Sequence, residues 1–295
     1  VLQFNQAFTE QDTYIAEQLG NLLAIELWRR PEIRTQEREN PAERLLRDVL
    51  DNSGGSPEDI QKRVNRIGWK LQPYLYTIRI QARQKELMSR ISLQELSQRL
   101  ASLLPNCTGL LYRNSVFLLL GSGTEITNFD HTLSPLLPTL EQYHLIAGIS
   151  NSFSSLHQLR EHGYQSGKAM HLGAVLELSK ILYLYRDYSL YYLMELGLKG
   201  EHVETFCLPG LLRLTEHCNH NGEDLLNTLQ VYLNCGRSKA ETARKMFLHV
   251  NTIRYRINQI QEIIGVDLDD DDNALNLMMS IKMMEYCALG APRSE

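Results

Sequence analysis

The sequence has few cysteines, and they are not arranged for disulfide bonds or a structural zinc site. Its 295 residues include five cysteines, an odd number, and no two of them form a CxxC pair. Scattered cysteines of this kind are typical of free thiols in a reducing cytoplasm. The histidines and cysteines between residues 202 and 220 are also spaced too widely for zinc ligands. We therefore expect a cytoplasmic protein with no metal and no cofactor.

Long apolar runs are absent as well. No apolar run approaches the roughly 18–20 residues that cross a bilayer, and the start of the chain shows no secretory signal. We expect no membrane partner. A net charge of −5 and a pI near 6.0 exclude a protein covered in nucleic-acid-binding charge, although they allow one small basic face. Because the chain begins with Val1 rather than Met, in helical-looking sequence, we expect it to be a piece of a longer protein.

Residues 1–59 predict a helical connector. Between Phe8 and Arg30, apolar residues recur at helical spacing, among them Ile15, Leu19 and Leu22. A second helix is predicted over Pro41–Leu50, and a third starts near Ser56 and runs to about Ile67. The apolar stripe of the first helix either packs on its own domain or forms a contact between two copies of the chain.

Residues 60–186 contain both strand and helix patterns, which together predict an α+β domain with an antiparallel sheet. The expected strands are Tyr74–Ala82, two strands within Thr108–Gly121 around a tight turn at Arg113-Asn114, His144–Ser150 and Lys180–Tyr185. The expected helices are Ser92–Leu104 and Leu156–Leu178. We interpret residues 187–222 as a helical linker, with a break at His217–Asp224, and residues 223–295 as an all-α domain.

The last domain separates its charges. Six basic residues and one acidic residue lie between Arg237 and Gln261, whereas six acidic residues and no basic residue lie between Glu262 and Asp272. A solvated surface usually mixes the two signs. The separation indicates that the basic part meets a polyanion, with the acidic run facing away from it.

Four helices are predicted in this domain: Asp224–Asn234, a helix opening with the capping box Ser238-x-x-Glu241, a helix from about Asn251 to Gly265, and about Asn273 to Leu289. The inner face of the second helix is predicted to be Ala240, Ala243 and Phe247. The third helix carries an isoleucine stripe (Ile253, Ile257, Ile260, Ile264). Two helices joined by the short turn Leu248-His249-Val250 form the layout of a helix-turn-helix.

In such a pair the second helix enters the major groove, N-terminal end first. With the isoleucine stripe facing the core, a rotation of 100° per residue directs amide, hydroxyl and guanidinium groups outward. These groups read base edges and hold phosphates. Tyr255 could instead pack on a neighbouring helix, and Arg256 lies close enough to the apolar stripe for a structural salt bridge. The candidate DNA-binding residues are Ser238, Lys239, Arg244, His249, Asn251, Thr252, Arg254, Tyr255, Arg256 and Asn258.

These segments resemble the C-terminal DNA-binding domain of the PucR/CdaR-type bacterial transcription regulators. The matching pieces are "LLNTLQVYL" (Leu225–Leu233), "ETARKMFLHVNTIRYRI" (Glu241–Ile257) and "IIGVDL" (Ile263–Leu268). The resemblance implies a sequence-specific transcription regulator, commonly an activator, whose recognition helix begins at the Asn251-Thr252 pair. It also implies a sensor domain upstream of this chain, through which a small-molecule effector would act.

The middle block, roughly Ile60 to Leu178, resembles the degenerate GGDEF-like domain that these regulators carry. A nucleotide cyclase of that fold holds metal ions with carboxylates near the first strand and at the hairpin. Here no Asp or Glu occurs from Leu96 to Thr124, which includes the hairpin turn. Hard cations need oxygen anions as ligands. We therefore expect a chain that is not an enzyme.

Two other short motifs fail as catalytic signals. "GISNS" (Gly148–Ser152) lacks the last glycine of a nucleophile elbow. "GYQSGKA" (Gly163–Ala169) is one residue short of a phosphate-binding loop and lacks Ser or Thr after its lysine.

The sequence thus predicts a regulator that binds double-stranded DNA as a homodimer. Two copies are expected because one short helix makes few base contacts against the many non-specific sites of a genome. The alternative is a ligand-responsive protein-interaction module with a vestigial helix-turn-helix.

Overall fold

The structure is a computed structural model that describes residues 40–83, 93–198, 202–221 and 224–288. The predicted helix between Phe8 and Arg30 lies outside these residues. The chain divides into two compact units, residues 1–72 with 155–160, and residues 73–154 with 161–295. None of the helices in the described ranges is long and apolar enough to cross a membrane.

The first unit contains two helices of the predicted connector, α3 (Pro41–Leu50) and α4 (Pro57–Arg66), and the short 3₁₀ helix η2 (Leu156–Gln158). The start of α4 is a reciprocal capping box. The Ser56 hydroxyl accepts a hydrogen bond from the Asp59 N–H, and the Asp59 carboxylate accepts one from the Ser56 N–H, both at 3.2 Å. Both predicted helices are confirmed.

The second unit begins with a five-stranded sheet in the order β2-β3-β1-β4-β5. The strands are β1 (Tyr74–Ala82), β2 (Cys107–Tyr112), β3 (Ser115–Ser122), β4 (Leu145–Ile149) and β5 (Leu182–Leu184). Four strands pair antiparallel, but β5 pairs parallel to β4. The predicted antiparallel sheet is therefore confirmed apart from this one parallel edge, where α8 (Leu159–Leu176) connects β4 to β5 as a crossover helix.

The predicted hairpin is confirmed at its turn. Arg113 and Asn114 both adopt left-handed backbone conformations, with φ of 46° and 58°. Two consecutive left-handed residues form the turn whose twist matches that of the two flanking strands. The turn sets the register in which Tyr112 pairs with Ser115 and Cys107 pairs with Leu120.

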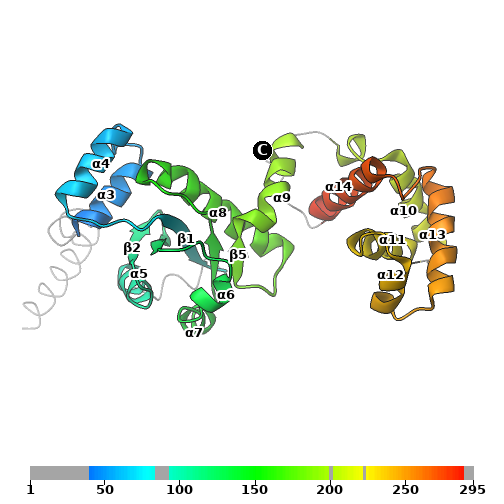
Figure 1. Ribbon diagram of the computed structural model, residues 1–295, viewed down its shortest axis with the longest axis horizontal. Coiled ribbons are helices and arrows are strands. Elements are labelled where there is room, and N and C mark those ends of the chain that lie inside the picture. Colours follow the sequence, from blue (N-terminus) through cyan, green and yellow to red (C-terminus); the bar gives the residue numbers. More distant parts are fainter. Residues whose placement is uncertain (1–39, 84–92, 199–201, 222–223, 289–295) are drawn as a thin grey trace, which may run out of the picture. The chain divides into compact units, whose positions relative to one another are not determined.

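Successive side chains of β1 point to opposite faces of the sheet. Tyr76, Ile78 and Ile80 are buried on one face, in a core shared with α5 (Leu93–Ser102), α6 (Phe129–Thr132) and α7 (Leu137–Gln142). Figure 1 shows α8 on the opposite side of the sheet from α5 and α7. The sheet is therefore covered on both faces, which explains why most of β3 is apolar rather than alternating.

α8 lies unusually close to the sheet. A Cβ atom added to Gly148 of β4 would come 2.0 Å from the carbonyl oxygen of Ser166, and one added to Gly173 would come 2.0 Å from the ring of Tyr183. A buried polar network reinforces this contact. The Thr77 hydroxyl lies 2.6 Å from the carbonyl oxygen of His162 and 3.1 Å from the Ser166 hydroxyl.

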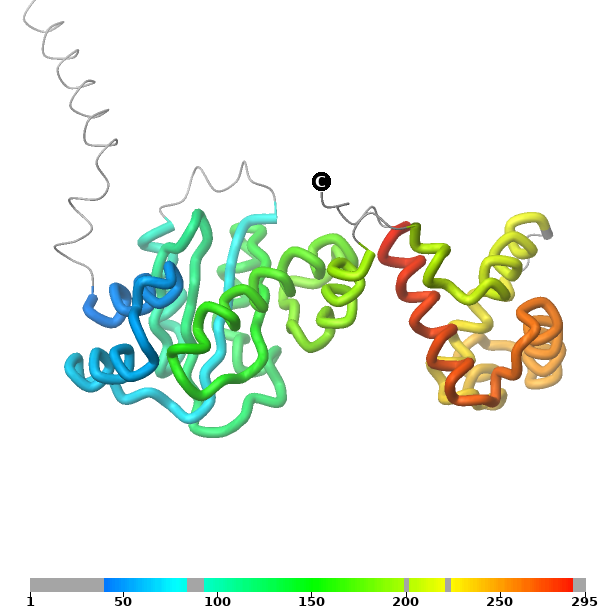
Figure 2. Tube along the Cα trace, turned by 90° about the horizontal axis from the view of Figure 1, so that it is seen from above, coloured from blue at the N-terminus to red at the C-terminus, as the bar shows by residue number. Residues whose placement is uncertain are grey.

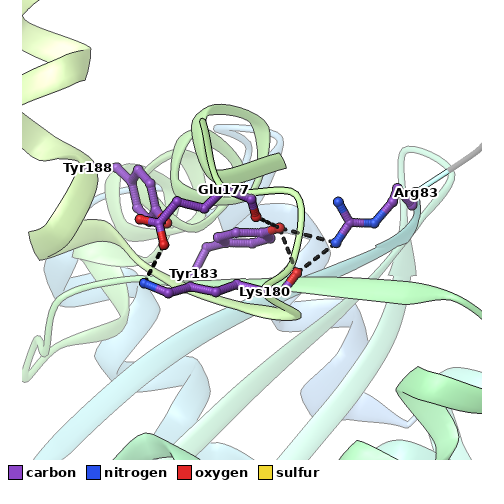
Figure 3. Close-up of polar contacts among 5 residues, drawn as sticks. All are labelled: Arg83, Glu177, Lys180, Tyr183 and Tyr188. Atoms are coloured by element: carbon purple, nitrogen blue, oxygen red, sulfur yellow. Dashed lines mark hydrogen bonds and ion pairs between the residues drawn. The ribbon is translucent and has the colours of Figure 1, made fainter. Parts of the chain in front are cut away.

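The turn between α8 and β5 is held by a group of polar contacts (Figure 3). The Tyr183 hydroxyl lies 2.7 Å from the carbonyl oxygen of Lys180 and 3.0 Å from that of Glu177. The Arg83 guanidinium, which follows β1, donates to the same Lys180 carbonyl at 2.6 Å. The Tyr188 hydroxyl donates to the Glu177 carboxylate at 3.0 Å. These bonds attach the start of α9 (Tyr185–Gly197) to the end of the sheet.

The predicted linker continues as η3 (Val203–Thr205) and α10 (Pro209–Asn221). The predicted break at His217–Asp224 falls later than expected, because α10 runs through His217 and ends at Asn221, before α11 starts at Leu225. Leu211 and Leu214 are buried and Cys218 is half-buried, so these residues keep one face of α10 on the C-terminal core despite the polar residues around them.

The C-terminal helices are α11 (Leu225–Asn234), α12 (Lys239–Met246), α13 (Val250–Ile264) and α14 (Asp271–Ala288). They gather around one apolar core to which α10 also contributes (Figure 2). All four predicted helices are present, with ends that shift by at most two residues. Gly236 and Gly265 adopt left-handed conformations after α11 and α13, with φ of 58° and 78°.

Candidate nucleic-acid interface

α12 and α13 form the predicted helix-turn-helix pair. The Ser238 hydroxyl caps α12 by accepting a hydrogen bond from the Glu241 N–H at 3.2 Å. α12 ends at Met246, and Phe247 follows it as the C-cap with a left-handed backbone, φ 56° and ψ 39°. His249 caps α13, because its Nδ1 atom accepts a hydrogen bond from the Asn251 N–H at 3.2 Å. Three residues therefore separate the two helices.

The isoleucine stripe fixes which side of α13 faces outward. Ile253, Ile257, Ile260 and Ile264 are all buried in the C-terminal core. The residues on the other side of the helix are exposed: Asn251, Thr252, Arg254, Tyr255 and Asn258. Tyr255 is 70% exposed, so it does not pack on a neighbouring helix. Residues 251–258 of α13 thus present two amides, a threonine hydroxyl, a phenol and a guanidinium to solvent.

The predicted inner face of α12 is correct only in part. Ala243 is buried, but Ala240 is exposed and the Phe247 side chain is 95% exposed. The reason is the left-handed backbone at Phe247, which ends the helix and turns this residue away from the core. An exposed phenyl group, which the helical spacing did not indicate, therefore lies two residues before the cap of α13.

Several basic residues are held by contacts within the domain. The Arg244 guanidinium lies 2.7 Å from the Glu241 carboxylate on the same helix, although both side chains are exposed. Arg256 is half-buried, and its Nη1 atom donates to the Thr228 hydroxyl of α11 at 3.0 Å. The contact predicted for Arg256 is therefore structural, with a neutral hydroxyl in place of a carboxylate. Lys239 is half-buried at the start of α12, and Lys245 is exposed.

The acidic run is also part of the fold. The Asp271 carboxylate pairs with Arg237, and the carbonyl oxygen of Asp269 accepts a hydrogen bond from the same guanidinium at 2.8 Å. The hydrogen bond to Asp271 raises the pKa of Arg237. The Asp270 carboxylate accepts from the Asn273 N–H at 2.9 Å, in the first turn of α14. One basic residue of the separated set is therefore neutralised by the acidic run.

The described residues give little support for a metal site. No group of three histidine, cysteine or carboxylate side chains in the described ranges is placed to hold a metal ion. His217, Cys218 and His220 lie along α10, where His220 Nδ1 lies 2.8 Å from the carbonyl oxygen of Glu216.

Comparison with known proteins gives two domain matches. Residues 225–283 match the PucR C-terminal helix-turn-helix domain, and residues 53–171 match a GGDEF-like domain.

Three named relatives are 24–31% identical to this chain over the residues that align. The chain is 24% identical over 266 residues to the proline-responsive transcriptional activator PutR of Bacillus subtilis, covering 85% of this chain and 63% of that protein. It is 27% identical over 136 residues to the purine catabolism regulatory protein of B. subtilis, covering 46% and 25%. It is 31% identical over 103 residues to the carbohydrate diacid regulator of Escherichia coli, covering 35% and 26%. The chain therefore spans less than two thirds of the length of each of these relatives.

Proposed function

We propose that this chain, which belongs to the PucR/CdaR-type bacterial regulators, is a sequence-specific DNA-binding transcription regulator. The observation that carries the proposal is the exposed N-terminal half of α13. Its polar side chains are aimed away from the core by four buried isoleucines, so a rigid helix presents them as one surface. This arrangement suits insertion into the major groove.

The side chains of this surface differ in their place along α13, and so in the DNA groups that they can contact. Asn251, Thr252 and Arg254 are exposed at the N-terminal end of α13, where base edges are reached first. Tyr255 and Asn258 lie further along the same side. We assign these residues to base and phosphate contacts.

The other candidates surround this surface. Lys239, Arg244 and His249 are suited to phosphates of the flanking backbone. Ser238 and Arg256 act mainly by holding the helices, because their side chains already cap α12 and bond to Thr228.

The GGDEF-like domain is proposed to have no cyclase activity. The turn of its hairpin consists of Arg113 and Asn114, and no acidic residue occurs from residue 96 to 124. Two-metal catalysis at this turn would lack its oxygen ligands. The relatives are named as regulators, which supports the same conclusion.

We further propose that the working species is a cytoplasmic homodimer and an activator that responds to a small metabolite. PutR is named as a proline-responsive activator. The effector of the present chain would act through a sensor domain outside it. Two copies are needed on the argument that a single short recognition helix makes too few base contacts to compete with non-specific DNA.

The proposal is tested by measuring DNA affinity across a salt series. Duplexes are first selected from random DNA with the wild-type chain, and binding is followed by fluorescence anisotropy. Asn251→Ala and Arg254→Ala should each weaken binding by about 1–3 kcal/mol, or roughly 5- to 150-fold, if they contact bases. Arg99→Ala is the matched control, because Arg99 is exposed on α5 in the GGDEF-like domain.

Salt dependence separates DNA binding from the alternative of a vestigial helix-turn-helix that binds protein. Contacts to several phosphates make log K fall steeply with log salt. Wild-type affinity in both α13 variants, or an affinity for duplex DNA that barely changes with salt, would contradict the proposal.

A further inference from the structure

The face of the sheet that carries α8 contains a cavity with an unusual charge balance. It has a volume of about 410 Å³ and lies between β1, β4 and α8. This volume falls within the roughly 300–1,000 Å³ of small-molecule sites. Its charged lining residues are Arg79, Arg83 and Lys168, together with His171, and no carboxylate of the described part of the chain lines it.

One of these cations is neutralised and two are not. Lys168 Nζ lies 2.8 and 2.9 Å from the two carboxylate oxygens of Glu195. Arg79 Nε donates to the buried Ser115 hydroxyl at 3.0 Å, and Arg83 donates to the Lys180 carbonyl oxygen (Figure 3). Among the described residues, neither guanidinium is paired with a carboxylate. The cavity therefore carries an excess of positive charge.

The fold makes specific room for Arg79. Its guanidinium lies against α8 at Gly167, where an added Cβ atom would come 2.9 Å from Nη1. Burial lowers the pKa of Arg79, which is the effect of removing a charge from water without an opposite partner. Arg79 is half-buried. Withdrawing a cation from water without a counter-charge is costly, and a bound anion would lower this cost.

The rest of the cavity is suited to an organic molecule. Ile146, Met170 and Ala174 supply apolar walls, and Met170 is buried. Tyr164 and His171 are exposed where the cavity meets solvent. A ligand could therefore place an apolar body on β4 and α8 and an anionic group on β1.

We propose that this cavity binds a small organic anion whose carboxylate or phosphate group is held by Arg79. An arginine fork matches both of these groups, because its parallel N–H bonds can engage two oxygens at once. The site lies within the GGDEF-like domain and does not depend on the DNA-binding surface of α13. It would give this chain a ligand site of its own.

The test uses the full chain and three probes of similar shape: benzoate, phenyl phosphate and neutral benzamide. Binding is measured by ligand-detected NMR in Tris-chloride buffer free of other oxyanions. Benzoate or phenyl phosphate should bind at millimolar concentration, and benzamide should not. The tighter anion identifies the head group that the site prefers.

Two variants then address Arg79 directly. Arg79→Gln keeps a hydrogen-bonding group but removes the charge, and it should weaken anion binding at least about tenfold, the loss of one charge-assisted hydrogen bond. Gly167→Ala keeps every charge but crowds the guanidinium, and it should also weaken binding. Since alanine favours a helix more than glycine does, this variant should remain folded. Arg99→Gln, an exposed arginine on α5, should bind as the wild type does.

Three outcomes would overturn the proposal. The first is that neither anion binds at millimolar concentration. The second is that benzamide binds as well as benzoate, since the charge would then be irrelevant. The third is that Arg79→Gln, shown to be folded by circular dichroism, binds the anions as tightly as the wild type.

Discussion

Replacing Phe247 with glycine should stabilise the C-terminal domain, although it removes a large apolar side chain. Phe247 ends α12 with φ 56° and ψ 39°, and its side chain is 95% exposed. A residue with a Cβ atom destabilises the folded domain by about 1–2 kcal/mol in this left-handed conformation, whereas glycine does not. Almost none of the roughly 1.5–3 kcal/mol available from burying a phenylalanine is realised at this exposure.

One opposing effect reduces the gain. Glycine gives the unfolded chain more conformational freedom, which lowers stability by about 0.4–1 kcal/mol. The capping bond from the Leu248 N–H to the Ala243 carbonyl oxygen, 3.0 Å long, is between backbone atoms and is kept. The net expectation for Phe247→Gly is a gain of about 0.5 kcal/mol.

Phe247→Ala separates the two contributions. It removes the phenyl group but keeps the left-handed strain, so its stability should stay close to that of the wild type. Native-state hydrogen exchange of the α12 and α13 amides measures the opening free energy of this domain directly. If Phe247→Ala lost more than about 1 kcal/mol, the phenyl group would have to be packed. If Phe247→Gly were less stable than Phe247→Ala, the argument from backbone strain would be wrong.

Three further predictions concern other contacts. Gly148→Ala should lower the free energy of unfolding in urea by at least about 2 kcal/mol, because its methyl group would meet a backbone carbonyl of α8; Gly197→Ala, with nothing within 4 Å, should not lower it. Burial lowers the pKa of His162 from 6.5, so the unfolded chain binds the proton more readily and stability should fall as the pH drops below about 6.5. This pH dependence, followed by thermal unfolding, should be weaker in His162→Gln. Thr228→Val should cost about 1 kcal/mol in urea unfolding, because Arg256 loses its hydroxyl acceptor while the side-chain volume is kept; an unchanged midpoint would show that this hydrogen bond adds no stability.

The elements whose apolar residues recur at a regular spacing were predictable from the sequence. The alternation in Tyr74–Ala82 correctly identified β1 and its buried face, and the four isoleucines correctly identified the buried side of α13. In both cases the apolar residues of one face pack together in a core, so the spacing in the sequence repeats the geometry.

Features that depend on where a helix ends, or on partners far away in the sequence, were not predictable. Phe247 continues the helical spacing of α12, but the chain leaves the helix at this residue, and its side chain no longer follows that rotation. Arg237 belongs to the basic part of the separated charges, yet its partner Asp271 lies 34 residues away. For Arg256 the sequence predicted a structural contact, but not its partner Thr228, which lies 28 residues away. The cavity on β1 likewise combines Arg79 with a glycine of α8 that only the sheet brings close.

The close approach of α8 to the sheet also limits how related sequences can vary. At Gly173 an added Cβ atom would come 2.0 Å from the ring of Tyr183, and Tyr183 itself is fully buried. The two positions therefore share one volume. A relative with a larger residue at the position of Gly173 should carry a smaller one at that of Tyr183, so the pair is expected to covary in size. Such a relative would also lack the phenolic hydroxyl that holds the turn after α8, so a substitution at one glycine would require changes in both the packing and the hydrogen bonds of β5.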